Sequence, residues 1–440
     1  MKTFILFSLS VFISVTAAQS AFSQEMLTLD EAIQTGFENN YGIQRFRNNL
    51  EIASNNRSLG NAGFLPTVLL SASQTERIED SEFETGGDSQ TTSGARSSVT
   101  NAALNAGWVV FDGLRMFTAY DRLGEIEQIS DNQLRLEMEF LAEQIINAYY
   151  NIIRINEQLK VLENSVDVSL ERIEIEETKL DLGSGSEYEL LQAKSDLSAD
   201  QAADLRENNN LTEAKITMNE LLARSPSTEF SVTTEIPVNR SLSREELHRK
   251  LMAENSELAI ARLLHRVAEL EVQEIRGERF PEIALSSGYS YNRNEAGGGF
   301  FRFNETTGFS FGITARVNIF DGFNTNRRVQ NAQINQKNAR LQLEEDRLRL
   351  ESDFLAVFRA YQNSIELVDL EQNNLENAEQ TLDIALERFR LGSISSLELR
   401  EAQRTFLAAE NRLIDAKYDA KLAETELLQL SGDLKSTLVQ

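Results

Sequence analysis

The sequence predicts a mixed α/β membrane protein made of two similar halves, each with two β-strands and a long coiled-coil hairpin of helices. Three observations carry this prediction. Short motifs recur in the same order in both halves of the chain. Four segments alternate apolar and polar residues, as half-buried strands do. Two very long stretches, 114–182 and 323–391, contain no proline and one glycine between them.

The first residues have the features of a targeting segment. A single basic residue, Lys2, precedes an apolar run over 4–15, which is shorter than the ~20 residues that span a bilayer. Ala21-Phe22-Ser23 fits the small-x-small cleavage pattern. We therefore expect residues 1–23 to be a secretory signal peptide, with an uncleaved anchor as the alternative. No later segment is apolar for long enough to predict a transmembrane helix.

Composition excludes several classes of function. The chain carries 43 Lys and Arg against 69 Asp and Glu, a net charge of −26, whereas nucleic-acid binding requires clustered basic residues. Cysteine is absent, and the two histidines, His248 and His265, are too far apart to share a metal as an i, i+4 pair does. We expect both to be exposed helix residues. Motifs for hydrolysis or phosphate binding are also missing. The sequence thus predicts no enzyme, cofactor or metal site.

Two halves follow from the spacing of the repeated motifs. Asn40 and Pro66 have counterparts 215 residues later, and Gly113 and Gly183 have counterparts 209 residues later. The paired motifs are Asn40 with Asn255, Phe64-Leu65-Pro66 with Arg279-Phe280-Pro281, Phe111-Asp112-Gly113 with Phe320-Asp321-Gly322, and Leu182-Gly183-Ser184 with Leu391-Gly392-Ser393. We interpret this as duplication, with repeats at 24–225 and 243–440 and a linker at 226–242. Each repeat begins with a helix.

Alternation predicts strands at about 66–78, 98–111, 281–292 and 305–320. In the last of these, one face carries the apolar residues Phe309, Phe311, Ile313 and Val317, which we expect to face lipid. Aromatic residues stand near the segment ends, as membrane-interface girdles do: Trp108, Tyr289, Tyr291 and Phe320. The polar, glycine-rich segments 79–96 and 293–304 are expected to be loops.

Four strands cannot close a membrane barrel, since the smallest has 8. Open sheet edges are not tolerated in lipid, so several chains would have to share one barrel. A soluble hairpin that packs its apolar face on a helix is the alternative.

Each long stretch is followed by a glycine turn, at Gly183 or Gly392, and by a returning helix at 187–224 or 396–431. Apolar residues along both long helices recur at alternating steps of four and three, which is a heptad seam. In the first half the seam continues through Val166, Leu170, Ile173, Glu177 and Leu180. Where strand becomes helix, Asp112 and Asp321 are expected to cap free N–H groups, and Gly113 and Gly322 to allow a sharp turn.

Four features of the sequence carry a family resemblance: the opening run Leu27-Thr28-Leu29-Asp30-Glu31-Ala32-Ile33 before Asn39-Asn40, the Phe-Leu-Pro entry, the Phe-Asp-Gly exits and the Leu-Gly-Ser tips. Together they resemble the TolC family of outer-membrane efflux and secretion channels. The resemblance implies a homotrimer in the Gram-negative outer membrane. Three chains would form a 12-stranded barrel, continued through the periplasm by a hollow helical barrel. The implied partners are a periplasmic adaptor (membrane-fusion) protein and an inner-membrane RND or ABC pump.

The resemblance also implies a gate at the hairpin tips. Two carboxylates after the second tip glycine would line the periplasmic aperture, at Glu398 and Glu401, with Glu189 and Gln192 in the matching first-half positions. Residues i and i+3 share a helix face, so both glutamates could point into a lumen. Ordinary solvated glutamates are the alternative.

Two positions depart from the family pattern. A tyrosine and an arginine that latch the closed tip in relatives are replaced here by Phe389 and Ile394. That polar latch cannot form in this chain. Arg388, Arg390 and Arg400 lie close enough in the sequence to pair with the carboxylates instead.

The predicted function is a passive outer-membrane exit duct of a tripartite efflux or type I secretion system. A periplasmic coiled-coil scaffold or adaptor without a pore is the alternative.

The strand phase makes a prediction. Phe311→Arg or Ile313→Arg should impair membrane assembly, because a lipid-facing arginine at the bilayer midplane costs about 2–4 kcal/mol. Thr314→Arg, on the opposite face, should be better tolerated. The yield of assembled protein in outer-membrane fractions measures the effect, and equal yields for all three variants would show that the predicted phase is wrong.

Overall fold

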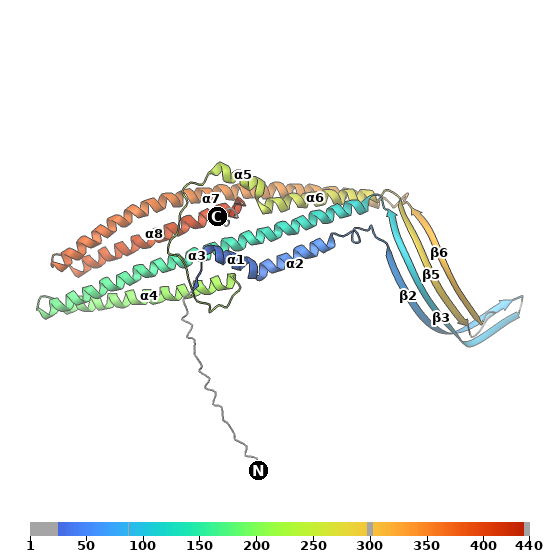
Figure 1. Ribbon diagram of the computed structural model, residues 1–440, viewed down its shortest axis with the longest axis horizontal. Helices are drawn as coiled ribbons and strands as arrows, with labels where there is room; N and C mark the ends of the chain where they lie inside the picture. Colours follow the sequence, from blue (N-terminus) through green and yellow to red (C-terminus); the bar gives the residue numbers. More distant parts are fainter. Residues whose placement is uncertain (1–24, 87, 297–301, 435–440) are drawn as a thin grey trace, which may run out of the picture.

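The computed structural model describes residues 25–434 except residue 87 and residues 297–301, so the predicted signal peptide lies outside the described residues. The molecule is long and narrow, with helices along most of its length and a curved sheet at one end (Figure 1). Within the described ranges, no helix combines the length and the apolar character needed to cross a membrane.

The sheet contains β2 (Thr67–Thr85), β3 (Asp88–Phe111), β5 (Glu282–Ala296) and β6 (Phe303–Arg316). They pair in the order β2-β3-β5-β6, and each neighbouring pair is antiparallel. The two hairpins come from the two halves of the chain and meet at the β3–β5 pair. The predicted combination of four strands with long helices in a twofold repeat is therefore confirmed.

The predicted strand ends need correction. Segment 79–96 is mainly strand, because β2 and β3 stay paired past a bulge between Glu79 and Ser81 as far as Thr85 and Asp88. β3 pairs with β5 only from Ser97 onward, so the rest of the first hairpin projects as a two-stranded ribbon (Figure 1). Such a ribbon is exposed on both faces and shows no apolar alternation, which is why its sequence resembles a loop.

In the second hairpin the last strand was predicted to be too long at its C-terminal end. β6 ends at Arg316, so Val317 and Phe320 lie beyond the strand and the prediction that Val317 is a lipid-facing strand residue is wrong. Of the predicted loop at 293–304, residues 293–296 belong to β5, 303–304 belong to β6, and 297–301 lie outside the described residues.

Among the described residues, each half supplies four helices rather than the three predicted. The first half has α1 (Leu29–Asn39), α2 (Tyr41–Asn56), α3 (Arg115–Asp181) and α4 (Glu187–Leu221). The second has α5 (Arg244–Glu254), α6 (Ser256–Gly277), α7 (Asn324–Arg390) and α8 (Ser396–Leu430). The opening helix of each half is split at an asparagine. A β-region backbone at Asn40 and at Asn255 interrupts the helix and makes each residue the N-cap of the next one.

The two asparagines also fix the returning helices. Asn40 Nδ2 donates to the carbonyl of Leu221, and Asn255 Nδ2 donates to the carbonyl of Leu430, both at 3.0 Å. Each bond satisfies a carbonyl that the last helical turn leaves free. The same joint therefore closes both hairpins of the duplicated fold.

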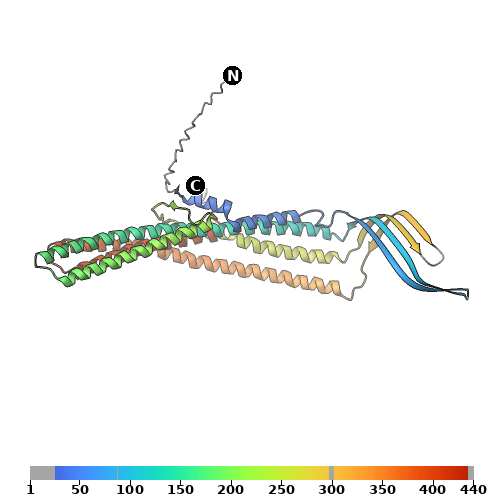
Figure 2. The same ribbon diagram turned by 90° about the horizontal axis from the view of Figure 1, so that it is seen from below.

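The helical layer repeats the order of the sheet. α2 leads into β2, α3 follows β3, α6 leads into β5 and α7 follows β6. α2 packs on α3, α3 on α6 and α6 on α7 (Figure 2). Consequently α2 and α7 form the ends of the helical layer, just as β2 and β6 form the edges of the sheet.

The main core lies among the helices, around α1, the middle of α3 and α7 and the C-terminal ends of α4 and α8, and it includes part of the predicted linker. Phe230, in β4 (Phe230–Ser231), is fully buried there, and β4 pairs in parallel with β1 (Glu25–Met26). The Tyr149 hydroxyl donates to the carbonyl of Leu27 at 3.0 Å. Segment 226–242 is thus partly built into the core. His248 is exposed but its ring lies 5.6 Å from that of Phe354, and His265 is half-buried rather than exposed.

The turns from strand to helix use left-handed backbone. Gly113 and Gly322 have φ of +76° and +66°, and the residues after them, Leu114 and Phe323, have φ of +67° and +65°. A non-glycine residue in this region is strained by about 1–2 kcal/mol. Nothing in the sequence predicts that second left-handed residue.

The two aspartates at these turns behave differently. Asp321 Oδ2 accepts a hydrogen bond from the backbone N–H of Thr325 at 2.7 Å, at the start of α7. Asp112 makes no such bond: its Oδ2 lies 3.8 Å from Arg115 Nε, and its buried Oδ1 has no hydrogen-bond partner within the described part of the chain. The prediction that Asp112 caps the helix is therefore wrong. The hydrogen bonds at this turn come instead from the Arg115 side chain, which donates to the Asp112 carbonyl and to Glu282.

The two turns allow a matched test. Gly113→Ala should destabilise the protein more than Gly322→Ala, although both changes place alanine in left-handed backbone at a cost of about 1–2 kcal/mol. A Cβ at position 113 would lie 2.3 Å from the Gly277 carbonyl oxygen, whereas at position 322 the nearest atom is 3.8 Å away. Thermal unfolding followed by circular dichroism measures the difference, and equal midpoints would show that the contact with Gly277 relaxes freely.

Candidate functional site

The two hairpin tips end in the same backbone motif. Gly183 and Gly392 have φ of +75° and +69°. Ser184 N–H donates to the Lys179 carbonyl at 2.9 Å, and Ser393 N–H donates to the Arg388 carbonyl at 2.8 Å. These six-to-one bonds are those of a Schellman motif, which stops a helix sharply. Each long helix therefore reverses within a few residues.

The candidate aperture residues lie just after these turns. Glu398 is exposed and forms a capping box with Ser395, whose N–H and hydroxyl donate to Glu398 Oε2 at 2.8 and 2.9 Å. The hydrogen bonds from the Ser395 backbone and hydroxyl lower the pKa of Glu398, so this carboxylate stays charged at neutral pH. Glu401 is exposed one turn later on the same side of α8.

The first-half tip is built differently. Ser186 makes no side-chain capping bond at the start of α4. Glu189 is half-buried, and Gln192 is exposed and donates to Asp196 at 3.4 Å. The duplicated tips thus share a backbone but not a charge pattern.

The arginines near the second tip have other partners. Arg390 pairs with Glu171 at 2.6 Å and with Glu387 at 3.0 Å. Arg400 donates to both carboxylate oxygens of Asp200, at 2.8 and 2.9 Å. The suggestion that Arg390 and Arg400 pair with Glu398 or Glu401 is therefore wrong, and Arg388 influences Glu398 only through its charge.

The two positions that depart from the family latch are both engaged. Phe389 is fully buried, and Lys179 Nζ lies 3.9 Å from the centre of its ring, a cation–π contact between the two hairpins. Ile394 is half-buried and packs on the cluster of Leu382, Ala385, Phe389 and Leu399.

A buried polar network joins the two hairpins behind the tip, and the sequence did not predict it. Arg172 of α3 is fully buried, and it donates to Ser396 Oγ of α8 at 2.7 Å and to Asp196 of α4 at 2.8 Å. Arg400 and Asp200 form the next link, between α8 and α4. We name Arg172, Asp196, Asp200, Ser396 and Arg400, together with Ser165, Ser169 and Gln403, the inter-hairpin network.

The network is well supplied with donors. Ser169 Oγ donates to Asp200 Oδ2 at 2.6 Å, and Gln403 Nε2 donates to the carbonyl and the hydroxyl of Ser165, both at 3.1 Å. Burial alone would raise the pKa of Asp200, but the hydrogen bonds from Arg400 and Ser169 outweigh it and the pKa is lowered. Asp200 therefore stabilises the paired hairpins at neutral pH, and this contribution is lost only in acid, as pH falls through its depressed pKa.

The network explains an error in the predicted heptad seam of the first half. Leu170 and Leu180 of that seam are exposed, whereas the buried stripe of α3 is Ser165, Ser169, Arg172 and Glu176. The steps of this stripe are also four, three and four. A search for apolar periodicity passes over it, because its buried side chains are polar. Ser165, Ser169 and Arg172 bond to groups on α4 and α8, and Glu176 pairs with Lys179 of α3 itself.

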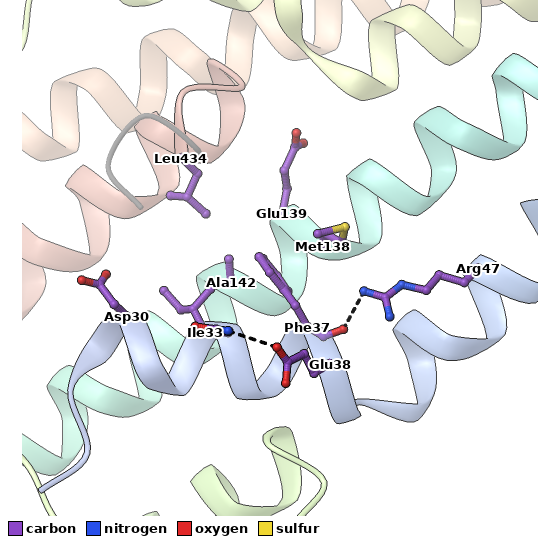
Figure 3. Close-up of a pocket in the computed structure, with 10 residues that line it drawn as sticks. Asp30, Ile33, Phe37, Glu38, Arg47, Met138, Glu139, Ala142 and Leu434 are labelled. Atoms are coloured by element: carbon purple, nitrogen blue, oxygen red, sulfur yellow. Dashed lines mark hydrogen bonds between the residues drawn. The ribbon is translucent and has the colours of Figure 1, made fainter. Parts of the chain in front are cut away.

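A separate cavity of about 500 Å³ lies near the main core, between α1, α3 and Leu434 (Figure 3). Ile33, Phe37, Ala142 and Leu434 give it apolar walls. Two of its polar neighbours are bonded within α1 and α2: Glu38 accepts from Gln34 at 3.1 Å, and Arg47 donates to the Phe37 carbonyl at 3.0 Å. We assign it no ligand.

Comparison with known proteins identifies the family. The model of the family described as outer membrane efflux protein matches residues 32–224 and 247–433, which is most of the chain and both repeats. The chain belongs to the outer membrane efflux protein family. This family is one of transport proteins, and its members act as exit ducts of efflux systems in the outer membrane. The chain is therefore an outer-membrane efflux duct.

Individual members of the outer membrane efflux protein family are distant in sequence. The outer membrane protein TolC of Vibrio cholerae is 21% identical over 316 residues, covering 69% of this chain and 70% of TolC. The pyoverdine export outer membrane protein OpmQ of Pseudomonas aeruginosa is 25% identical, covering 92% and 85%. The crystal structure of VceC from Vibrio cholerae superposes with a TM-score of 0.75 at 16% identity, covering 92% of this chain and 96% of VceC.

A double-mutant cycle tests the inter-hairpin network in this efflux duct. Arg400→Gln and Asp200→Asn should show a coupling energy of about 2 kcal/mol or more, because each single change leaves the other charge buried. The matched surface pair is Arg390 and Glu171, which are 48% and 38% exposed and should couple by less than about 1 kcal/mol. Chemical unfolding of the four single and two double variants gives both energies. Equal coupling in the two pairs would contradict the special status of the buried pair.

Proposed function

We propose that three copies of this chain close into one tube, with a 12-stranded barrel in the outer membrane and a helical barrel in the periplasm. The observation that carries the proposal is that sheet and helical layer have the same order and the same two open ends. β2 and β6 leave unpaired edges, and the helices connected to them, α2 and α7, lie at the two ends of the helical layer. Pairing β6 of one copy with β2 of the next brings α7 of the first beside α2 of the second.

The exposed surface of α7 supports this closure. Ile334, Leu341, Leu348 and Leu355 follow one another at heptad steps and are 53%, 67%, 66% and 48% exposed in the single chain. Four apolar residues at heptad spacing form the kind of seam that another helix covers. In the closed tube that helix is α2 of the neighbouring copy.

The register of the sheet supports a lipid-facing outer surface. Trp108, Leu285 and Ile313 lie in one row across β3, β5 and β6, and Phe309 and Phe311 lie on the same face of β6. Phe309, Phe311 and Ile313 are 67%, 83% and 71% exposed. A soluble scaffold without a pore has no use for such a face, so we set that alternative aside.

At the tips, threefold symmetry would place six carboxylates, from Glu398 and Glu401, around the aperture. Such a ring attracts cations and repels anions. Glu189 and Gln192 would contribute the first-half side of the opening. The Phe389–Lys179 contact and the inter-hairpin network hold α7 and α8 against α3 and α4, and this packing favours a closed tip.

Opening then requires an external partner that shifts the hairpins. A periplasmic adaptor docked on the hairpins, together with an inner-membrane RND or ABC pump, would supply the binding energy and drive transport. The duct itself would conduct passively.

The aperture proposal is tested by Glu398→Gln with Glu401→Gln. The double variant should lose most of its cation preference and its block by multivalent cations, because the ring becomes neutral. Glutamine at the third helical position still suits a capping box, so the start of α8 is preserved. Reversal potentials in planar bilayers under a salt gradient measure selectivity.

The control changes the same charge elsewhere. Glu229→Gln with Glu235→Gln lies in the linker segment and should leave selectivity unchanged. Unchanged selectivity in the Glu398 and Glu401 double variant, with an intact oligomer, would show that these side chains do not line the opening.

A further inference from the structure

The apolar face of the sheet carries a recess of about 560 Å³, close to the end of the sheet that joins the helices. Its apolar walls are Pro66, Trp108, Leu285, Phe311 and Ile313. Pro66 directly precedes β2, and Trp108 is near the end of β3, so the recess lies where strands meet helices (Figure 1).

The strand register explains why a hollow forms there. One row across β3, β5 and β6 is Trp108, Leu285 and Ile313, and the row two residues further from the helices begins with Ala106 and Ser287, followed by Phe311. The next row is bulky again, with Leu104, Tyr289 and Phe309. Two small side chains between bulky rows leave a groove whose floor includes the backbone at Gly107 and Gly312.

Two features make the recess more than a gap. The Trp108 ring is held in place, because its Nε1 donates to the Phe64 carbonyl at 2.8 Å. The Ser287 hydroxyl lines the recess and has no hydrogen-bond partner among the residues that the structure describes. A hydroxyl on an apolar face retains an unused donor, which costs free energy unless an acceptor is supplied.

We propose that this recess binds one phospholipid of the periplasmic leaflet, with an acyl chain in the groove and the Ser287 hydroxyl donating to an ester carbonyl. The proposal rests on the proposed function, because it takes the apolar face to contact the membrane. The recess is continuous with that membrane interface, and its apolar walls match a hydrocarbon chain. Ester carbonyls are the acceptors that the edge of a bilayer offers.

Position selects the leaflet. The recess adjoins the helical end of the sheet, and Trp108 beside it is the residue type enriched at membrane–water interfaces. The hydrocarbon core is about 30 Å thick, so acyl chains anchored at the opposite surface have their ester groups too far away to reach Ser287. We therefore commit to a glycerophospholipid rather than to lipid A.

The test compares two alanines on the same strand face. Ala106→Leu fills the groove, whereas Ala102→Leu adds the same side chain four residues along β3, outside the lining residues. Purified protein in mild detergent is titrated with palmitoyl-oleoyl phosphatidylethanolamine, and native mass spectrometry counts bound lipids. Ala106→Leu should raise the dissociation constant by about tenfold, the effect of displacing about two buried methylenes, and Ala102→Leu should leave it unchanged. Ser287→Ala, which keeps the groove open, should weaken binding by about threefold through loss of one hydrogen bond.

The same spectra separate this proposal from the proposed function. A trimer that binds the lipid equally well in wild type, Ala106→Leu and Ala102→Leu would overturn the lipid site and leave the duct intact. Tighter binding of lipid A than of phosphatidylethanolamine would overturn the assignment to the periplasmic leaflet. A monomer that needs no detergent would overturn the lipid site together with the proposed trimer.

Discussion

An unpaired strand edge cannot remain open in lipid, because its backbone N–H and C=O groups find no water there. In this chain that constraint falls on β2 and β6, the two edges of the four-stranded sheet. Each strand of this sheet connects to one helix, and the helices keep the order of the strands. Any closure of the sheet by further copies therefore closes the helical layer as well. In the proposed trimer, closure of the sheet is therefore enough to arrange the long helices around a lumen.

At the opposite end, the chain holds its hairpins together with buried charge rather than with apolar packing alone. A fully buried arginine, Arg172, and the pair of Arg400 with Asp200 are costly to remove from water, and only complete hydrogen bonding offsets that cost. Such a contact is stable when every partner is present and weak once one is displaced. This property suits the proposed gate, in which a partner opens a closed tip.

The two halves share joints and turns that follow from duplication, and they differ in the side chains around them. Asn40 and Asn255 make the same two-sided joint in both halves. The tips share their glycine turns, but only the second carries the Ser395–Glu398 capping box. The halves also differ at the strand-to-helix turns, since Gly113 lies close against the Gly277 backbone whereas a Cβ at Gly322 would make only an ordinary contact with Asn324. The repeats thus share the order of their elements and these joints, and they differ in strand length and in side-chain chemistry.

The sequence by itself determined the repeat, the four strands, the long hairpins and the family, because each depends on periodicity or on short motifs that local backbone geometry requires. Only the tertiary structure decided the inter-hairpin network, the strained Leu114 and Phe323, and the extended ribbon of β2 and β3. Ser165, Ser169, Arg172 and Glu176 have the spacing of a seam without its apolar character. Whether a polar side chain is buried depends on which groups other helices bring to it, and no local pattern in one helix contains that information.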